Sequence, residues 1–311
     1  MNDEKDRKNI RIIEWDDMDK RKFYAFGMVL SMTIRGMIYP TSLIKTRLQV
    51  QRQNAIYHGT WDAFKKITKY EGVRGLYKGF IINTFTIFSG QCYITTYELM
   101  HKGCGDLNNT AKSFIAGGCA SFVAQSITVP IDIVSQHIML EGQSLEERAG
   151  RRKVTLKDGL KIAKRIYHVD GWKGFYRGYW ASLMTFMPNS ALWWPIYHFY
   201  VERLASLLQG NLELSIPAIA IQAMAGPAAG ATAATLTNPM DIVRTRLQVY
   251  GGNSILLTFS KLIEEEGAKG MTKGLTARLL NAMPSSLVII VGYESLKRLS
   301  LRSELADSRQ W

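Results

Sequence analysis

The sequence predicts an all-α membrane protein with six transmembrane helices, arranged as three tandem pseudosymmetric repeats of two helices each. The first observation is a set of long, mostly apolar segments, at residues 23–44, 80–100, 111–138, 178–201, 217–249 and 274–299. Each segment also carries polar residues, and the apolar content of the chain is only 47%. Helices with one polar face around a water-filled cavity explain both facts. A soluble helical bundle is the alternative.

Two short motifs recur three times in the same order, which is the second observation. The first motif starts with proline and reads PTSLIKTR (40–47), PIDIVSQH (130–137) and PMDIVRTR (239–246). The second motif reads EGVRGLYKG (71–79), DGWKGFYRG (170–178) and EGAKGMTKG (266–274). The repeating unit is about 100 residues long. We therefore divide the chain into five parts: an N-terminal tail 1–20, repeats 21–110, 111–212 and 213–300, and a C-terminal tail 301–311.

The connections between the helices alternate in charge, which is the third observation. Segments 51–79, 140–178 and 250–274 are rich in lysine and arginine, whereas 101–112 and 202–216 hold very few. This asymmetry is typical of the positive-inside rule and places the three basic connections on one side of a membrane. The net charge of +13 is then explained by anionic lipid headgroups rather than by nucleic acid.

The residues indicate no enzyme, metal site or cofactor. The three cysteines form no C-x-x-C pair, and the five histidines show no metal-ligand spacing. No nucleophile elbow and no phosphate-binding P-loop is present. The charged N-terminus lacks the apolar core of a secretory signal.

Three ordered copies of this two-part motif, over nearly the whole chain, resemble the mitochondrial carrier family. The resemblance implies the mitochondrial carrier fold, a multi-pass protein of the mitochondrial inner membrane and alternating-access transport of a small molecule. It also implies a monomer in contact with anionic phospholipid such as cardiolipin. Four further stretches resemble family members that import branched-chain amino acids: SGQCYITTYEL (89–99), AQSITVPIDIVSQH (124–137), PNSALWWPIYHFY (188–200) and SLRSELADSRQW (300–311). These imply leucine, isoleucine and valine as substrates.

Two alternatives remain open at this point. One is a carrier of another small neutral amino acid or monocarboxylate. The other is a carrier-derived adaptor that no longer transports, in which we would expect motif residues to be lost haphazardly.

The family resemblance implies a matrix gate, in which the acid of one proline motif pairs with the base of the next. Applied here, the rule pairs Asp132 with Arg244 and Asp241 with Lys45, and it leaves Ser42 opposite Ser135. The missing charges are therefore partners, and a matched loss avoids an unpaired buried charge. The two hydroxyls could share a hydrogen bond or a water. Gln49 and Gln248 follow the bases and could each brace an ion pair.

A weaker cytoplasmic gate is expected near the ends of the even-numbered helices. The family pattern there is an aromatic residue followed by an acid and, three residues on, a base. Glu294 with Lys297 is intact, Glu98 has His101 in place of the base, and the second repeat lacks both charges.

The candidate substrate site is where the threefold pattern breaks. Arg35 lies two helical turns, about 10 Å, from Ser42 on the same helix face, and its counterparts are Gln125 and Ala234. An arginine inside a membrane should face the cavity, where it can hold a carboxylate. A structural hydrogen-bond role is the alternative. Arg278 is a further base inside the membrane. The positions of substrate contacts in the family, on the even-numbered helices, correspond to four uncharged residues: Thr86, Thr185, Phe186 and Asn281.

The starts of two even helices are candidate lipid sites. Backbone N–H groups at a helix N-terminus can hold a phosphate. The candidate residues are Gly72, Lys78 and Gly79 in the first repeat and Gly171, Arg177 and Gly178 in the second. For each of these two sites, a turn that only starts the helix and binds no lipid is an equally good interpretation.

Overall fold

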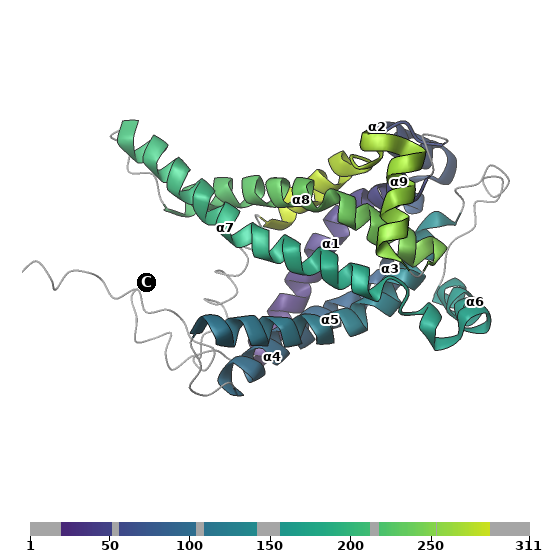
Figure 1. Ribbon diagram of the computed structural model, residues 1–311, viewed down its shortest axis with the longest axis horizontal. Coiled ribbons are helices and arrows are strands. Elements are labelled where there is room, and N and C mark those ends of the chain that lie inside the picture. The colour runs from purple at the N-terminus through teal and green to yellow at the C-terminus, as the bar shows by residue number, and fades with distance from the viewer. Residues whose placement is uncertain are drawn as a thin grey trace, which may run out of the picture.

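A computed structural model describes residues 20–51, 56–103, 109–141, 156–211, 218–252 and 254–286. Within these ranges all regular secondary structure is helical, which confirms the predicted all-α class. Figure 1 shows long helices that converge at one end of the molecule and diverge at the other.

The odd-numbered transmembrane helices of the three repeats are α1 (Lys20–Val50), α5 (Asn109–Leu140) and α8 (Ala218–Tyr250). Each contains the proline of its motif: Pro40, Pro130 and Pro239. Proline cannot donate the intrahelical hydrogen bond and its ring crowds the preceding turn, so it bends a helix without ending it when the flanking residues are well packed.

The even-numbered transmembrane helices start directly after a glycine of the second motif. In the first repeat this helix is split into α3 (Phe80–Thr84) and α4 (Thr86–Gly103), with a break at Phe85. In the second repeat it is α7 (Tyr179–Asn211), and in the third residues 275–286 are helical. Gly79 shows why glycine precedes the helix. Its φ is +81°, and a Cβ there would lie 3.0 Å from the Ser135 carbonyl oxygen.

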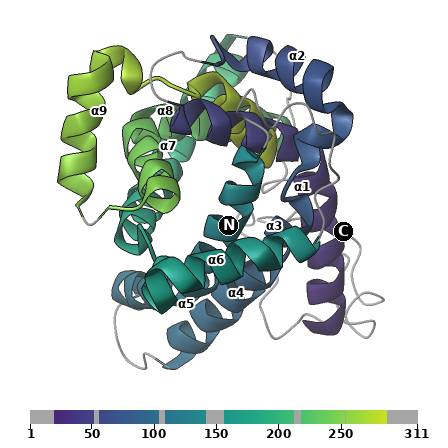
Figure 2. The ribbon, with the colours of Figure 1, turned by 90° about the vertical axis from the view of Figure 1, so that its right-hand side faces the viewer.

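The basic connections contain helices. These are α2 (Thr60–Glu71), the 3₁₀ helix η2 (Val73–Tyr77), α6 (Leu156–Gly174) and α9 (Ile255–Gly270). In Figure 2, α2, α6 and α9 lie around the convergent end of the long helices. Their apolar residues recur at helical spacing between the basic ones, so each can bury one face against the bundle.

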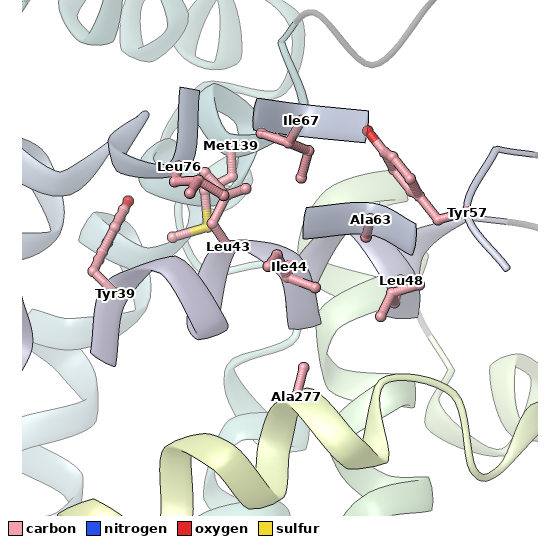
Figure 3. Close-up of a cluster of buried hydrophobic side chains, with 10 residues drawn as sticks. All are labelled: Tyr39, Leu43, Ile44, Leu48, Tyr57, Ala63, Ile67, Leu76, Met139 and Ala277. Atoms are coloured by element: carbon pink, nitrogen blue, oxygen red, sulfur yellow. The ribbon is translucent and has the colours of Figure 1, made fainter. Parts of the chain in front are cut away.

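The core is divided into small clusters at this convergent end. In the cluster of Figure 3, Leu43 and Ile44 of α1 pack with Ala63 and Ile67 of α2 and with Met139 of α5. Similar clusters surround Ile133 on α5 and Ile242 on α8. The three repeats therefore use the same packing at the same height.

Many large apolar side chains elsewhere are exposed on the outer surface, as expected for contact with lipid. Met37 is 74% exposed, Val29 66% and Trp180 64%. By length and composition, one helical segment of the described residues, Ile115–Leu140, is apolar enough to cross a membrane. The other long helices carry more polar residues on the face toward the cavity.

Candidate functional site

A cavity of about 620 Å³ lies between the long helices, next to the proline motifs. Its wall includes four bases and two acids: Arg35, Lys45, Arg244, Arg278, Asp132 and Asp241. Because this convergent end carries the basic connections, it is the side that the sequence assigns to the matrix.

The joint between α1 and α8 has a complete ion pair. Lys45 Nζ lies 2.7 Å from Asp241 Oδ2, and Gln49 donates to the same oxygen over 2.9 Å. Thr245 in turn donates to Gln49 over 3.0 Å. Arg278 adds a second base, with its Nε 3.8 Å from Asp241. The predicted pair and the predicted glutamine contact are thus both present in the geometry.

The joint between α5 and α8 has the second ion pair. Arg244 donates to Asp132 Oδ2 over 2.7 Å. Gln248, which the sequence suggested as its brace, contacts neither charge. It accepts from Gln136 over 2.7 Å and donates to Ser182 over 3.1 Å. The brace expected at this joint is therefore replaced by a chain of neutral hydrogen bonds.

The joint between α1 and α5 has no charge, as the sequence predicts, but its two serines do not bond each other. The Ser42 hydroxyl accepts from the Asn281 amide, and Ser135 donates to the Gly79 carbonyl over 3.4 Å. Each serine reaches an even-numbered helix rather than the opposite odd one. The two serines therefore share no direct hydrogen bond, and each hydroxyl bonds to a group of an even-numbered transmembrane segment.

Arg35 lines the cavity and makes no ion pair there. Its Nη1 donates to Asn83 Oδ1 over 2.6 Å, and Asn83 Nδ2 donates to Asp132 Oδ1 over 3.5 Å. A polar path thus leads from Arg35 through Asn83 to the gate acid Asp132.

Three of the other predicted substrate residues also lie in the cavity wall: Phe186, Asn281 and Arg278. Arg278 is anchored at the gate, because it donates to Thr237 over 2.7 Å as well as approaching Asp241.

Three predicted substrate residues, Thr86, Thr185 and Gln125, do not line this cavity. The buried Thr86 and Thr185 hydroxyls donate to backbone carbonyls of their own helix segments, at Asn83 and Ala181. Gln125 is buried within α5. Thr86, Thr185 and Asn281 all stand seven residues after their motif glycines, and of these only Asn281 lines the cavity.

Asn83 takes the place that sequence reasoning gave to Thr86. A signal for it exists in the motif: Asn83, Ser182 and Arg278 each stand four residues after the motif glycine. All three side chains contact residues of the proline-motif helices. A threefold comparison at this offset would have selected them.

The opposite end of the cavity shows no closed gate in the residues described. No ion pair joins Glu98 to His101, whose ring stacks on Tyr97 with centroids 5.8 Å apart. Glu294 and Lys297 lie outside the described residues. Figure 1 shows α7 and α8 diverging from α4 and α5 at this end.

A second layer of charge lies beyond the gate in the first and third repeats. Arg47 donates to Glu71, which also pairs with Lys78 over 2.8 Å. In the same way, Arg246 and Lys273 both pair with Glu266, over 2.8 and 2.6 Å. Each arginine also reaches the next repeat, because Arg47 donates to the Met139 carbonyl over 2.7 Å and Arg246 to the Gln49 carbonyl over 3.1 Å.

The second repeat keeps only part of this layer. Asp170 pairs with Arg177, as Glu71 pairs with Lys78 and Glu266 with Lys273. His137 occupies the position of the two arginines, and its Nδ1 donates to the Ile133 carbonyl of its own helix over 2.8 Å.

Of the candidate lipid residues, Gly79 and Gly178 directly precede α3 and α7, whereas Gly72 caps the end of α2 and Gly171 lies within α6. Gly72, Gly79, Gly171 and Gly178 all have positive φ, and Lys78 and Arg177 are both held in ion pairs. Any phosphate at these positions would therefore meet backbone N–H groups beside bases that are already oriented.

Comparison with known proteins supports the carrier reading. Three consecutive segments, 22–108, 106–207 and 217–304, match the family described as mitochondrial carrier protein. The chain is 55% identical to solute carrier family 25 member 44 of Homo sapiens and of Mus musculus, over 98% of this chain and 99% of the relatives. It is 31% identical to mitochondrial substrate carrier family protein J of Dictyostelium discoideum, over 93% of this chain and 94% of that protein. The chain therefore belongs to the mitochondrial carrier family, and it is a multi-pass transporter of the inner membrane rather than an enzyme.

Proposed function

We propose that this carrier imports the branched-chain amino acids leucine, isoleucine and valine into the matrix by alternating access. Arg35 is the observation that carries this proposal. Of the four bases in the cavity wall within the described residues, it alone has no acid within ion-pairing distance. A guanidinium without a counter-charge in the wall of a cavity is suited to a carboxylate.

The rest of the wall fits a small apolar body. Phe186, Met139 and Trp193 line the same cavity, together with the small residues Gly230, Ala234 and Ala282. A nucleotide or tricarboxylate would need several unpaired bases, and a cationic amino acid would need an unpaired acid. One carboxylate with an aliphatic side chain matches what the wall offers.

Alternating access follows from the two ends of the cavity. Two ion pairs close the matrix end, and the described residues at the other end form no matching pair. A substrate in the cavity can offset the free-energy cost of breaking the matrix ion pairs only if it binds more tightly to the state in which these pairs are broken. The transported solute therefore has to contact groups that are linked to the gate.

The direct test is uptake of radiolabelled leucine by proteoliposomes. We expect Arg35→Ala to lower uptake at limiting leucine at least about tenfold, because it removes a charge-assisted pair of hydrogen bonds. Arg35→Lys should retain only part of the wild-type uptake. Arg203→Ala removes an arginine that stacks on Phe199 outside the cavity, and uptake should match the wild type. Wild-type uptake by Arg35→Ala would overturn the assignment of Arg35.

A second candidate is a carrier of monocarboxylates such as 2-oxo acids. The observation in its favour is that both acids of the wall are already paired with bases, so that neither acid lacks a counter-charge. A thermal-shift and uptake screen with amino acids against the corresponding 2-oxo acids separates the two. If no solute is taken up or stabilises the protein, the non-transporting adaptor gains support.

We propose further that the carrier works as a monomer and binds cardiolipin at the starts of α3 and α7. The orientation of Lys78 and Arg177 beside glycine turns supports the lipid sites. Native mass spectrometry of protein extracted in mild detergent tests both points, since it reports the number of chains and of retained phospholipids together.

A further inference from the structure

The Asn83 side chain sits between a base and an acid of the cavity, and its orientation is forced. Arg35 can only donate, so the amide oxygen must face it, at 2.6 Å. The Asp132 carboxylate accepts, so the amide NH₂ must face it, at 3.5 Å. Asn83 thus presents its negative end to the arginine and its positive end to the aspartate.

An α-amino acid head group has the same polarity and nearly the same length. The oxygen and nitrogen of an amide are about 2.3 Å apart, whereas the ammonium nitrogen and carboxylate oxygen of an amino acid are about 3 Å apart. The 3.5 Å separation on the Asp132 side is longer than an optimal hydrogen bond by about 0.6 Å. The head group would therefore fill this gap better than the amide does.

The Asp132 carboxylate has capacity to accept another donor. Its Oδ2 is bound by Arg244, whereas among the described residues Oδ1 has only the long contact with Asn83. Its side chain is 16% exposed, against 5% for Asp241. Asp241 carries more contacts, because Lys45, Gln49 and Arg278 all approach its Oδ2.

We propose that the transported amino acid displaces the Asn83 amide, with its carboxylate on Arg35 and its ammonium group on Asp132 Oδ1. Asn83 is then a placeholder that keeps the two charges apart and satisfied in the empty cavity. This inference rests on the proposed function. It adds which protein groups bind the ammonium and the carboxylate of the substrate.

The arrangement links recognition to the gate. An ammonium group on Asp132 competes with Arg244 for the negative charge of the carboxylate, which weakens the ion pair at the α5–α8 joint. A 2-oxo acid would bind Arg35 but leave that pair intact. Selection of amino acids over their oxo acids and release of the gate would then depend on the same contact.

The first experiment uses the wild-type protein in detergent with three ligands of one shape. These are leucine, 4-methylpentanoate, which lacks the ammonium group, and 3-methylbutylamine, which lacks the carboxylate. We expect leucine to bind at least about tenfold more tightly than either, because each truncated ligand leaves one charge of the site unmatched. Equal Kd values for leucine and 4-methylpentanoate would overturn the placement of the ammonium group.

The second experiment measures the leucine Kd of Asn83→Ala. If the amide is displaced on binding, its removal should tighten leucine binding about two- to tenfold, because the substrate no longer competes with it. If Asn83 instead contacts the substrate or holds Arg35 in place, binding should weaken. The sign of the change therefore decides, and weaker binding by a folded variant refutes the placeholder role.

Thr84→Ala is the matched control for this variant. Thr84 is the next residue on α3, its hydroxyl donates to the Phe80 carbonyl over 2.9 Å, and it does not line the cavity. Its leucine Kd should stay within about twofold of the wild-type value, which is a smaller free-energy change than the net contribution of one hydrogen bond. Should Asn83→Ala fail to fold, the wild-type ligand series still tests the inference. If the wild-type protein binds other solutes but not leucine, that result contradicts the proposed function itself.

Discussion

Lys45 and Asp241 form an ion pair with Nζ and Oδ2 2.7 Å apart, and Gln49 donates to the same oxygen over 2.9 Å. The α1–α8 joint also receives Arg246, which donates to the Gln49 carbonyl over 3.1 Å. The α5–α8 joint has the Arg244–Asp132 ion pair but, among the described residues, no arginine that donates to a backbone carbonyl across the joint. The α1–α5 joint has such an arginine, Arg47, but no ion pair in the part of the chain that the structure describes. The three joints at the matrix end are thus unequal, and α5 is the helix held by the fewest charged contacts.

The two gate glutamines should differ in their effect on stability. Both are fully buried, but Gln49 donates to a charged carboxylate and Gln248 to a serine hydroxyl. Hydrogen bonds to charged groups contribute more, about 1.5–3 kcal/mol against about 1 kcal/mol for neutral ones. We expect Gln49→Ala to lower the unfolding temperature of the carrier further than Gln248→Ala does. A larger loss for Gln248→Ala would contradict the bracing role of Gln49.

Charge can be restored at the neutral joint. We expect the double variant Ser42→Asp with Ser135→Lys to be more thermally stable than either single variant and to transport more slowly, because a third ion pair would hold the matrix end closed. In a double-mutant cycle the coupling should reach about 1–3 kcal/mol. The reversed pair, Ser42→Lys with Ser135→Asp, is the control for orientation. Additive effects of the two single changes would show that positions 42 and 135 do not meet.

The second repeat should also accept the arginine that it lacks. By analogy with Arg47 and Arg246, the side chain of His137→Arg would reach the backbone carbonyl of Gln248 on α8. We expect this variant to unfold a few degrees higher than wild type and to take up substrate more slowly. His137→Gln removes the ring without adding a charge and should not raise the unfolding temperature. An unchanged unfolding temperature in His137→Arg would argue against α5 as the loosely held helix.

Acid should weaken the layer beyond the gate through Glu71, which lies on α2 outside the membrane-spanning helices. Burial opposes ionisation of this carboxyl, but the hydrogen bonds and charges of Arg47 and Lys78 outweigh it, so its pKa lies below the ordinary 4.5. The unfolded chain therefore takes up the proton first. The stabilisation is complete above pH 4.5 and is lost as the pH falls through the folded pKa.

The measurement is the unfolding temperature of purified carrier as the pH is lowered. Wild type should lose stability more steeply below pH 4.5 than Glu71→Gln, which has no carboxyl to titrate there. Glu264→Gln, at an exposed position on α9, should follow the wild-type curve. Parallel curves for wild type and Glu71→Gln would contradict the role of this carboxylate.

Residues that obey the threefold repeat were predictable. The acid and base positions of the proline motifs identify Asp132 with Arg244 and Asp241 with Lys45, and the structure brings both pairs to 2.7 Å. The pairing rule works because the three odd-numbered helices meet at one height. Their relative positions are then set by the motif alone.

Residues of the cavity wall on the even-numbered helices were not predictable by counting alone. Thr86 and Thr185, seven residues after their motif glycines, do not line the cavity, whereas Asn83, at an offset of four, does. A fixed count does not report which side chain reaches the cavity. The partners of Ser42, Ser135 and Gln248 were missed for a related reason. Neutral hydroxyl and amide groups bond to whatever donor or acceptor lies nearest, and motif spacing does not report that distance.

The amino-acid sequence by itself determined the architecture: three repeats, their proline motifs, the side that carries the positive charge, and the departure of Arg35 from symmetry. These are properties of periodicity and charge, which are written along the chain. Only the tertiary structure decided that PIDIVSQH belongs to a helix held by fewer charged contacts than its two counterparts, and that Asn83 joins Arg35 to Asp132. Both depend on which short polar side chains come within hydrogen-bonding distance, and packing between repeats sets those distances.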